Sequence, residues 1–417
     1  MDQTITDFRK IPLYQKRYFV PESANLRDAD TVLDLFEKLV SWPVRTAEDR
    51  DAWVLARSEM EAAMDQEAAV LYIRMTSYTD HEPFARDYQA YVEGISPISR
   101  QAKHDLDVKF LALAEDFSLE APFDGVYEKE VRADVQLFRE ENIPLATQLE
   151  LLSQEYQTLC GGLMVFFDGE ERTLPQMNRY MQSPDRGLRE AAWRAAAERR
   201  LSEQSRLDEL FDRMAALRGR QARNAGFDSF TPYQFRAYHR FDYTPEHCFD
   251  YHQAAQEMLV PLWGKILRRR QNSLKLDVLK PWDLDVDRLG RPALSPFKNV
   301  DGLKRGVGNI LENIDPEFSR AFKMMSDNGL LDLASRKGKA PGGYQHTLAE
   351  ARQPFIFMNA VGLDGDVRTL LHESGHAYHA LACAHHALYS YRHAPIEFCE
   401  VASMSMELFG INYLTEF

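Results

Sequence analysis

Hydrophobic residues recur at helical spacing along most of the chain. Over residues 32–40 the apolar side chains lie three and four positions apart, and Pro43 follows the last of them. Thr46 and Asp49 resemble a capping box at the start of residues 47–76, which are rich in the helix formers Ala, Glu, Met and Arg. This pattern predicts long amphipathic helices in the first part of the chain.

The middle of the chain shows two more helix signals. Ser183, followed by Pro184 and Asp185, predicts a helix start with a cap, a proline in the first turn and an acid at the positive end of the helix dipole. The apolar positions of residues 188–200 continue it. Residues 246–272 predict one further long amphipathic helix.

Strand signals are few. Residues 163–167 form a short apolar run that ends at the turn dipeptide Asp168-Gly169. Residues 344–348 and 354–361 are rich in β-formers, and a short polar stretch between them predicts a hairpin-like sheet. We therefore expect a mainly α fold with a small β element ahead of the final helices.

Composition and charge narrow the class of protein. The 417 residues are 45% hydrophobic and 27% charged, which is typical of a globular chain. The net charge of −14 argues against a nucleic-acid partner, and no run of about 18 apolar residues predicts a membrane helix. The four cysteines form no CxxC pair, and the charged N-terminus does not resemble a secretory signal. We expect a cytoplasmic protein with reduced thiols.

One motif carries most of the chemistry. His372, Glu373 and His376 form HExxH between apolar residues, which predicts a buried helix. Residues four apart share a helix face, so the two imidazoles can bind one metal ion while Glu373 lies beside it as a proton acceptor. Gly375 within this helix costs about 1 kcal/mol relative to Ala. Close approach of a neighbouring helix or of a substrate would explain it.

A catalytic zinc site needs a third protein ligand and one open position. The metzincin pattern is excluded, because it requires Gly and His where the chain has His379 and Ala382. His379 would bind nearly in line with the first two ligands, so we interpret it as a packing or outer-shell residue. A second helix begins near Pro395, and from the residues alone either Glu397 or Glu400 could reach the metal.

Two runs carry a family resemblance: HESGHAYH at residues 372–379 and PIEFCEVASMSME at residues 395–407. Both resemble the M3 family of zinc metallopeptidases, which includes thimet oligopeptidase and the bacterial oligoendopeptidase F group. The glycine of HExGH is typical of this family. Further upstream, four runs resemble the oligoendopeptidase F branch of this family. They are FFDGEE at residues 166–171, RFDYTPE at 240–246, RKGKAPGG at 336–343 and PFIFMN at 354–359.

The resemblance implies a large, bowl-like helical metallopeptidase (gluzincin) fold with a deep channel. It assigns the third-ligand role to Glu400, so that His372, His376 and Glu400 would hold one Zn²⁺ per chain with Glu373 as general base. The implied activity is a zinc-dependent endopeptidase that hydrolyses internal bonds of short oligopeptides. The residues alone leave two alternatives, a metallo-carboxypeptidase with an HExxH motif and a non-catalytic peptide-binding protein.

Supporting roles are also expected around this centre. Outer-shell candidates are Glu407 and Asp366. The family implies that the strand at residues 354–361 pairs with an extended substrate, and the expected substrate-binding residues are Phe357, Met358, Asn359, Gly342 and Gly343.

We expect one continuous domain, with an N-terminal helical region at residues 1–160 and a catalytic region at 161–417. M3 enzymes typically continue well past the third ligand, so the catalytic region is expected to lack a C-terminal helical segment and to show weak or no activity by itself. The sequence gives no prediction of the oligomeric state.

Overall fold

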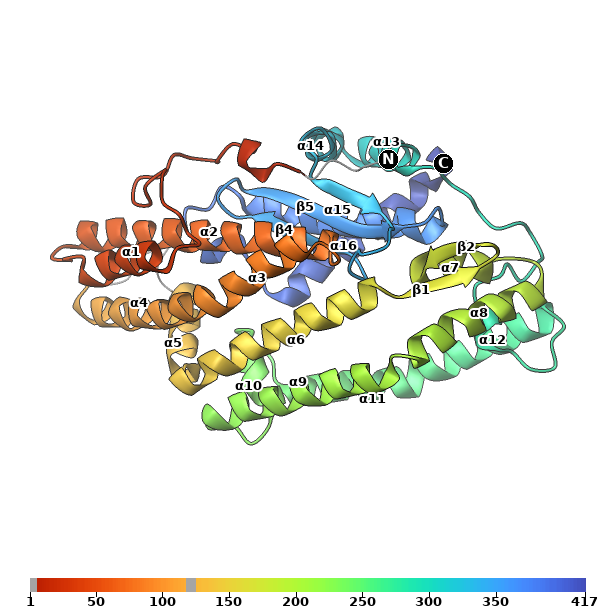
Figure 1. The fold of residues 1–417 in the computed structure, drawn as a ribbon, viewed down its shortest axis with the longest axis horizontal. Helices are drawn as coiled ribbons and strands as arrows, with labels where there is room; N and C mark the ends of the chain where they lie inside the picture. Colours follow the sequence, from red (N-terminus) through yellow and green to blue (C-terminus); the bar gives the residue numbers. More distant parts are fainter. Residues whose placement is uncertain (1–5, 118–124) are drawn as a thin grey trace.

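The computed structural model describes residues 6–117 and 125–417. The chain is mostly helical with two small sheets, as expected (Figure 1). The α-helices of the first half are α1 Ala29–Ser41, α2 Ala47–Ser77, α3 Glu82–Gly94, α4 Ser96–Asp116, α5 Val126–Leu137, α6 Ile143–Gly161, α7 Leu174–Met181 and α8 Arg186–Leu201. Those of the second half are α9 Gln204–Asn224, α10 Phe230–Ala237, α11 Pro245–Ala254, α12 Val260–Ser273, α13 Val300–Ile314, α14 Pro316–Asp327, α15 Asp364–Cys383 and α16 Ile396–Gly410.

Local signals placed the first long helix well. Thr46 and Asp49 form the predicted capping box at the start of α2: each side chain accepts a hydrogen bond of 3.1 Å from the backbone N–H of the other. The helix then continues through 31 residues to Ser77. Between α12 and α13 the chain is irregular, and the described residues there form a single helical turn, Pro281–Asp283.

The start predicted at Ser183 is two residues early. Helix α8 begins at Arg186, and its cap is Asp185, whose Oδ1 accepts the N–H groups of Gly187 and Leu188 at 2.8 and 3.3 Å. The hydroxyl of Ser183 instead accepts the N–H of Asp185. A carboxylate is favoured over a hydroxyl here because it also interacts with the positive end of the helix dipole.

The single helix predicted over residues 246–272 is interrupted. Helices α11 and α12 are joined by a π-helical turn, Ala255–Leu259, and Pro261 follows at the start of α12. Proline lacks an N–H and its ring clashes with the preceding turn of a regular α-helix. The wider π turn accommodates that defect without ending the helix.

The two sheets contain strands that the sequence pattern did not predict. Strands β4 Tyr344–Leu348 and β5 Gln353–Ala360 form the predicted antiparallel hairpin, but β3 Leu331–Ala334 pairs in parallel with the other edge of β5. Strand β1 Met164–Phe167 pairs with β2 Glu170–Thr173. The polar sequence of β2 and the shortness of β3 gave no periodic signal.

The largest core cluster lies between the three-stranded sheet and helices α13, α14 and α15. A second cluster joins α1, α2, α4 and α5. Helix α6 contacts α3 and α4 on one side and α9 on the other, so it separates the two groups of helices seen in Figure 1. The sheet and α15 thus share one continuous apolar core.

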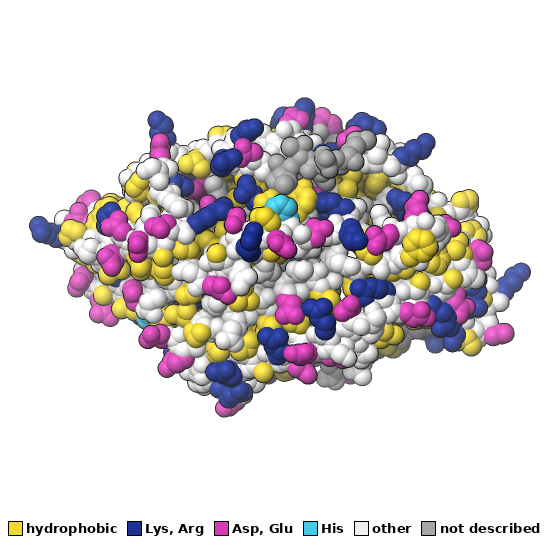
Figure 2. All heavy atoms as spheres, viewed as in Figure 1, with side chains coloured by type: hydrophobic (Ala, Val, Ile, Leu, Met, Phe, Trp, Pro, Cys, Tyr) yellow, Lys and Arg dark blue, Asp and Glu magenta, His cyan; other side chains and the backbone are white. Residues whose placement is uncertain are grey.

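The surface carries both signs of charge and some exposed apolar helix faces. Figure 2 shows acidic and basic side chains intermixed over the face drawn in Figure 1. No side chain of α11 or α12 is buried, and Met258, Val260 and Trp263 are exposed. Among the described residues, no helix has the length and apolar content that crossing a membrane requires.

The buried side chain of Lys339 links strands β3 and β5 of the three-stranded sheet. Its buried Nζ donates to Oδ1 of Asp332 at 2.9 Å and to the carbonyls of Asp332, Ala334 and Met358. It also lies 4.4 Å from the ring centroid of Phe357. Burial lowers the pKa of Lys339, and the carboxylate of Asp332 opposes that shift. The ammonium group therefore ties β3 and β5 together inside the core.

Replacing Lys339 tests that role. We expect Lys339→Met to lower the free energy of unfolding by about 3 kcal/mol, because three carbonyls lose a donor and the carboxylate of Asp332 keeps only its ion pair with Arg336. Lys337→Met is the matched control: Lys337 lies in the same segment but pairs with Glu171 at the surface, and its loss should cost less than about 0.5 kcal/mol. Denaturant titration measures both, and equal stabilities of the two variants would contradict the prediction.

Candidate metal centre

Helix α15 carries the HExxH motif. Leu370, Leu371 and Ala377 are buried in the core, whereas His372 and His376, one turn apart, are partly accessible. The helix start is held by Asp366, whose Oδ2 accepts the N–H groups of residues 361–363 at 2.7–2.9 Å. Asp366 was expected to orient a metal ligand. The structure instead uses it as a cap, because its carboxylate is engaged by three backbone donors.

Helix α16 crosses α15 at Gly375. A Cβ at this position would lie 2.6 Å from Cα of Ser403 and 2.7 Å from the carbonyl oxygen of Ala402. Contacts of that length with backbone atoms cannot be relieved by a side-chain rotation. Close approach of a neighbouring helix therefore explains Gly375.

The crossing brings three side chains together. Among the described residues, one group of His, Cys, Asp and Glu has metal-binding spacing: the ligand atoms of His372, His376 and Glu400 all lie within 4.8 Å of one another. Nε2 of His372 is 3.4 Å from one oxygen of Glu400, and Nε2 of His376 is 3.8 Å from the other. The two histidines and one carboxylate form a donor set that suits zinc, and Glu400 is half-exposed, which leaves room for a further ligand.

Other side chains orient these donors. Nδ1 of His372 lies 2.8 Å from Oε1 of Glu407, and the backbone of Cys399 hydrogen-bonds His376. The contact with Glu407 therefore leaves Nε2 of His372 directed toward Glu400. Burial lowers the pKa of His376, which favours the neutral imidazole that a metal ion requires. Ser403 donates to Oε2 of Glu400 at 3.1 Å.

Glu373 lies beside this cluster in a buried environment. Its side chain is 5% exposed, and its Oε2 has no hydrogen-bond partner in the part of the chain that the structure describes. Burial raises the pKa of Glu373 to about 7, with Glu400 adding to the shift and His372 opposing it. A Cβ on Gly343 would lie 3.2 Å from Oε1 of Glu373, so the absence of a side chain lets the start of β4 lie against the carboxylate.

The strand expected to bind substrate is not available for that role. Strand β5 lies between β3 and β4, so both of its edges are already paired. Phe357 and Met358 are buried, and Phe357 stacks on Tyr344 with ring centroids 4.6 Å apart. Asn359 donates to the carbonyls of Ala340 and Gly342 at 2.9 Å and so holds the glycine segment against the sheet. The outer strand on this side is β4.

Glu397, the alternative third ligand, points elsewhere. Its carboxylate accepts hydrogen bonds from Tyr243 and from Arg240, which also forms an ion pair with it. His379 is likewise outside the three-residue group. Arg240 and Tyr243 were assigned no role from the sequence, although both belong to the run at residues 240–246 that carries part of the family resemblance.

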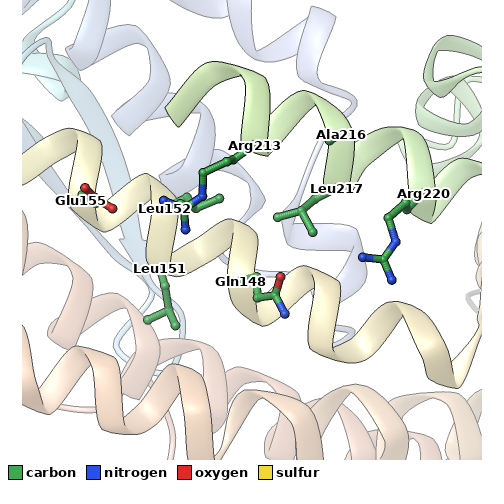
Figure 3. A pocket seen from close by; sticks show the side chains of 8 residues that line it. All are labelled: Gln148, Leu151, Leu152, Glu155, Arg213, Ala216, Leu217 and Arg220. Carbon is green, nitrogen blue, oxygen red and sulfur yellow. The ribbon is translucent and has the colours of Figure 1, made fainter. Parts of the chain in front are cut away.

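A separate cavity lies between α6 and α9 (Figure 3). It has a volume of about 410 Å³, and Figure 3 shows Gln148 and Leu152 of α6 facing Arg213 and Leu217 of α9. None of its lining residues belongs to the metal-binding group. We therefore assign it no part in the centre.

A mostly helical body that presents an HExxH helix and a glutamate from a crossing helix defines a metallopeptidase fold. The chain belongs to peptidase family M3, whose sequence model matches residues 179–417, more than half of the chain. This confirms the resemblance to M3 and the mainly α fold expected from the sequence.

The individual similarities agree with that assignment. The chromosomal oligoendopeptidase F of Lactococcus lactis subsp. cremoris is 26% identical over 182 residues, which are 42% of this chain and 28% of the relative. A solved structure of an oligoendopeptidase F has a TM-score of 0.90 at 25% identity and covers 96% of this chain and 71% of its own. A second, from Bacillus anthracis str. Ames, has a TM-score of 0.86 at 24% identity and covers 97% and 73%. The chain spans between 25% and 37% of the length of the curated relatives that it matches.

Gly375→Ala tests the helix crossing. We expect a loss of about 1–3 kcal/mol in the free energy of unfolding and weaker metal binding, because the new methyl group pushes α16 away from α15. Gly365→Ala is the matched control on the same helix, where a Cβ meets no atom within 4 Å. It should be neutral or more stable by up to about 1 kcal/mol. Similar losses in both variants would contradict the role of the crossing.

The pKa of Glu373 predicts a pH effect in metal-free protein. A carboxyl group whose pKa rises from 4.5 in the unfolded chain to about 7 in the folded one binds more protons when folded, so stability falls as the pH rises through that interval. Glu373→Gln removes this contribution. Relative to the variant, the wild type should lose up to about 3 kcal/mol between pH 4.5 and 8. Denaturant titrations after chelation measure the difference, and parallel pH profiles would show that the prediction is wrong.

Proposed function

We propose that this chain is the metal-binding part of a zinc-dependent endopeptidase that hydrolyses internal peptide bonds of short oligopeptides. The observation that carries the proposal is the convergence of His372, His376 and Glu400 beside the buried carboxylate of Glu373. Membership of peptidase family M3 supports it.

In this proposal Nε2 of His372, Nε2 of His376 and the carboxylate of Glu400 hold one zinc ion. Two imidazoles and one carboxylate are a common ligand set of catalytic zinc, which keeps its fourth position open. Glu407 acts as the outer-shell partner of His372, because its hydrogen bond to Nδ1 leaves Nε2 as the donor to the metal.

When bound, zinc acts as a Lewis acid that polarises the scissile carbonyl and makes a water molecule more acidic. Oε2 of Glu373 would accept a proton from a water molecule that attacks the carbonyl carbon of the substrate. The same carboxyl group then delivers the proton to the leaving amine. The position of Glu373 beside the three ligands, buried and with Oε2 unpartnered among the described residues, suits it to both steps.

The proposed substrate lies along β4 rather than β5. Strand β4 is the outer strand of the sheet, and its first residue follows Gly343, whose backbone lies against Glu373. An extended peptide that adds to this edge would bring a backbone carbonyl toward the cluster.

The four cysteines are unpaired, which fits the reducing conditions of the cytoplasm.

Zinc content and peptide cleavage together test the function. We expect wild-type protein and Glu373→Gln each to bind one zinc ion, while cleavage of a quenched fluorogenic oligopeptide falls by a factor of about 10³ or more in the variant, because the proton acceptor is lost. Glu400→Ala should fail to retain zinc. Its matched control, Glu397→Ala, should still bind one ion at saturating zinc.

Near-normal cleavage by Glu373→Gln would contradict the mechanism. Mass spectrometry of the products separates the alternatives: internal cleavage supports an endopeptidase, whereas release of single C-terminal residues would identify a carboxypeptidase. Peptide binding without turnover by zinc-loaded wild-type protein, even when the C-terminal helical segment of an M3 relative is supplied in trans, would identify a non-catalytic binding protein.

A further inference from the structure

A polar contact joins the start of α16 to a distant part of the chain. Glu397, one turn before Glu400, accepts hydrogen bonds from the hydroxyl of Tyr243 and the guanidinium group of Arg240. Tyr243 and Arg240 lie in the short segment between α10 and α11. This segment belongs to the group of helices that α6 separates from α3 and α4 (Figure 1).

Aromatic side chains hold Arg240 in place for this contact. The carbon of its guanidinium group lies 4.5 Å from the ring centroid of Phe235, 5.0 Å from that of Tyr238 and 5.6 Å from that of Tyr243. The rings of Phe235 and Tyr243 also pack edge to face, 5.5 Å apart. Cation–π contacts of this kind orient an arginine before it pairs, so little flexibility is lost in forming the ion pair.

The first turn of α16 contains no buried residue. The buried residues of the helix are Ser403, Met406 and Gly410, which all follow Glu400. In the first turn, Ile396 is 50% exposed and Phe398 is 64% exposed, and the helix has no side-chain cap. Packing against α15 therefore fixes the later turns, and the contact with Glu397 fixes the turn from which Glu400 projects.

We propose that Arg240 and Tyr243 are positioning residues for the metal centre: through Glu397 they hold the first turn of α16 and thereby direct the carboxylate of Glu400 toward His372 and His376. This inference rests on the proposed role of Glu400 as a metal ligand. It couples the zinc affinity of the centre to the segment between α10 and α11.

Zinc affinity, measured by competition with a chelator of known zinc affinity, tests the inference. Arg240→Met should raise the zinc dissociation constant about 10- to 100-fold, as loss of an outer-shell partner does, and Tyr243→Phe about threefold or more. Both variants should keep the helix content of the wild type by circular dichroism. In a Glu397→Ala background, Tyr243→Phe should change the dissociation constant less than about twofold, because the hydroxyl of Tyr243 acts through the carboxylate that this background removes.

Two matched controls lie at the end of α10 and the start of this segment. Arg236→Met removes an arginine that donates to Gln136 rather than to Glu397, and Tyr238→Phe keeps the ring over Arg240. Neither should change the zinc dissociation constant more than about twofold. Wild-type affinity in both Arg240→Met and Tyr243→Phe would overturn the inference, and so would an undiminished effect of Tyr243→Phe in the Glu397→Ala background.

Glu400→Ala separates this inference from the proposed function. If Glu400→Ala keeps wild-type zinc affinity, the proposed ligand set is wrong. If Glu400→Ala loses zinc while Arg240→Met and Tyr243→Phe retain wild-type affinity, the ligand set stands and the positioning role alone is wrong.

Discussion

The centre depends on the backbone contact between α15 and α16 at Gly375. A glycine within a helix weakens that helix by about 1 kcal/mol, and the chain accepts this cost where a side chain would strike Ser403 and Ala402. Because the helices touch at this point, a glutamate on one helix reaches two histidines on the other. The His-His-Glu geometry is therefore a consequence of helix packing, which the HExxH motif by itself does not specify.

The two carboxylates nearest the histidines differ because of their surroundings. Glu373 points into a buried space bordered by the start of β4, which raises its pKa to about 7, whereas Glu400 is half-exposed on the crossing helix. The different environments suit one carboxylate to proton transfer and the other to metal binding. The buried ion pair of Lys339 with Asp332 supports this arrangement, because it joins β3 to β5, one of the strands on which α15 packs.

Local patterns predicted the elements and only part of the centre. Helical periodicity and the capping box at Thr46 placed α2 correctly, and the hairpin of β4 and β5 followed from its β-formers. The start of α8 was missed because two neighbouring side chains, those of Ser183 and Asp185, could each have served as the cap. The π turn before Pro261 was missed because the helical periodicity continues through the proline. Strands β2 and β3 were missed because β2 is polar and β3 is short, so neither shows strand periodicity. Pairing with β1 and β5 makes them strands.

The sequence by itself determined the spacing that puts His372 and His376 on one helix face, with Glu373 beside them, because that spacing is a property of a single helix. Only the tertiary structure decided that Glu400 rather than Glu397 meets the histidines, that Asp366 is a cap, and that β5 is enclosed between two strands. These outcomes depend on contacts between residues far apart in the chain, and the periodicity of a sequence carries no information about such distances.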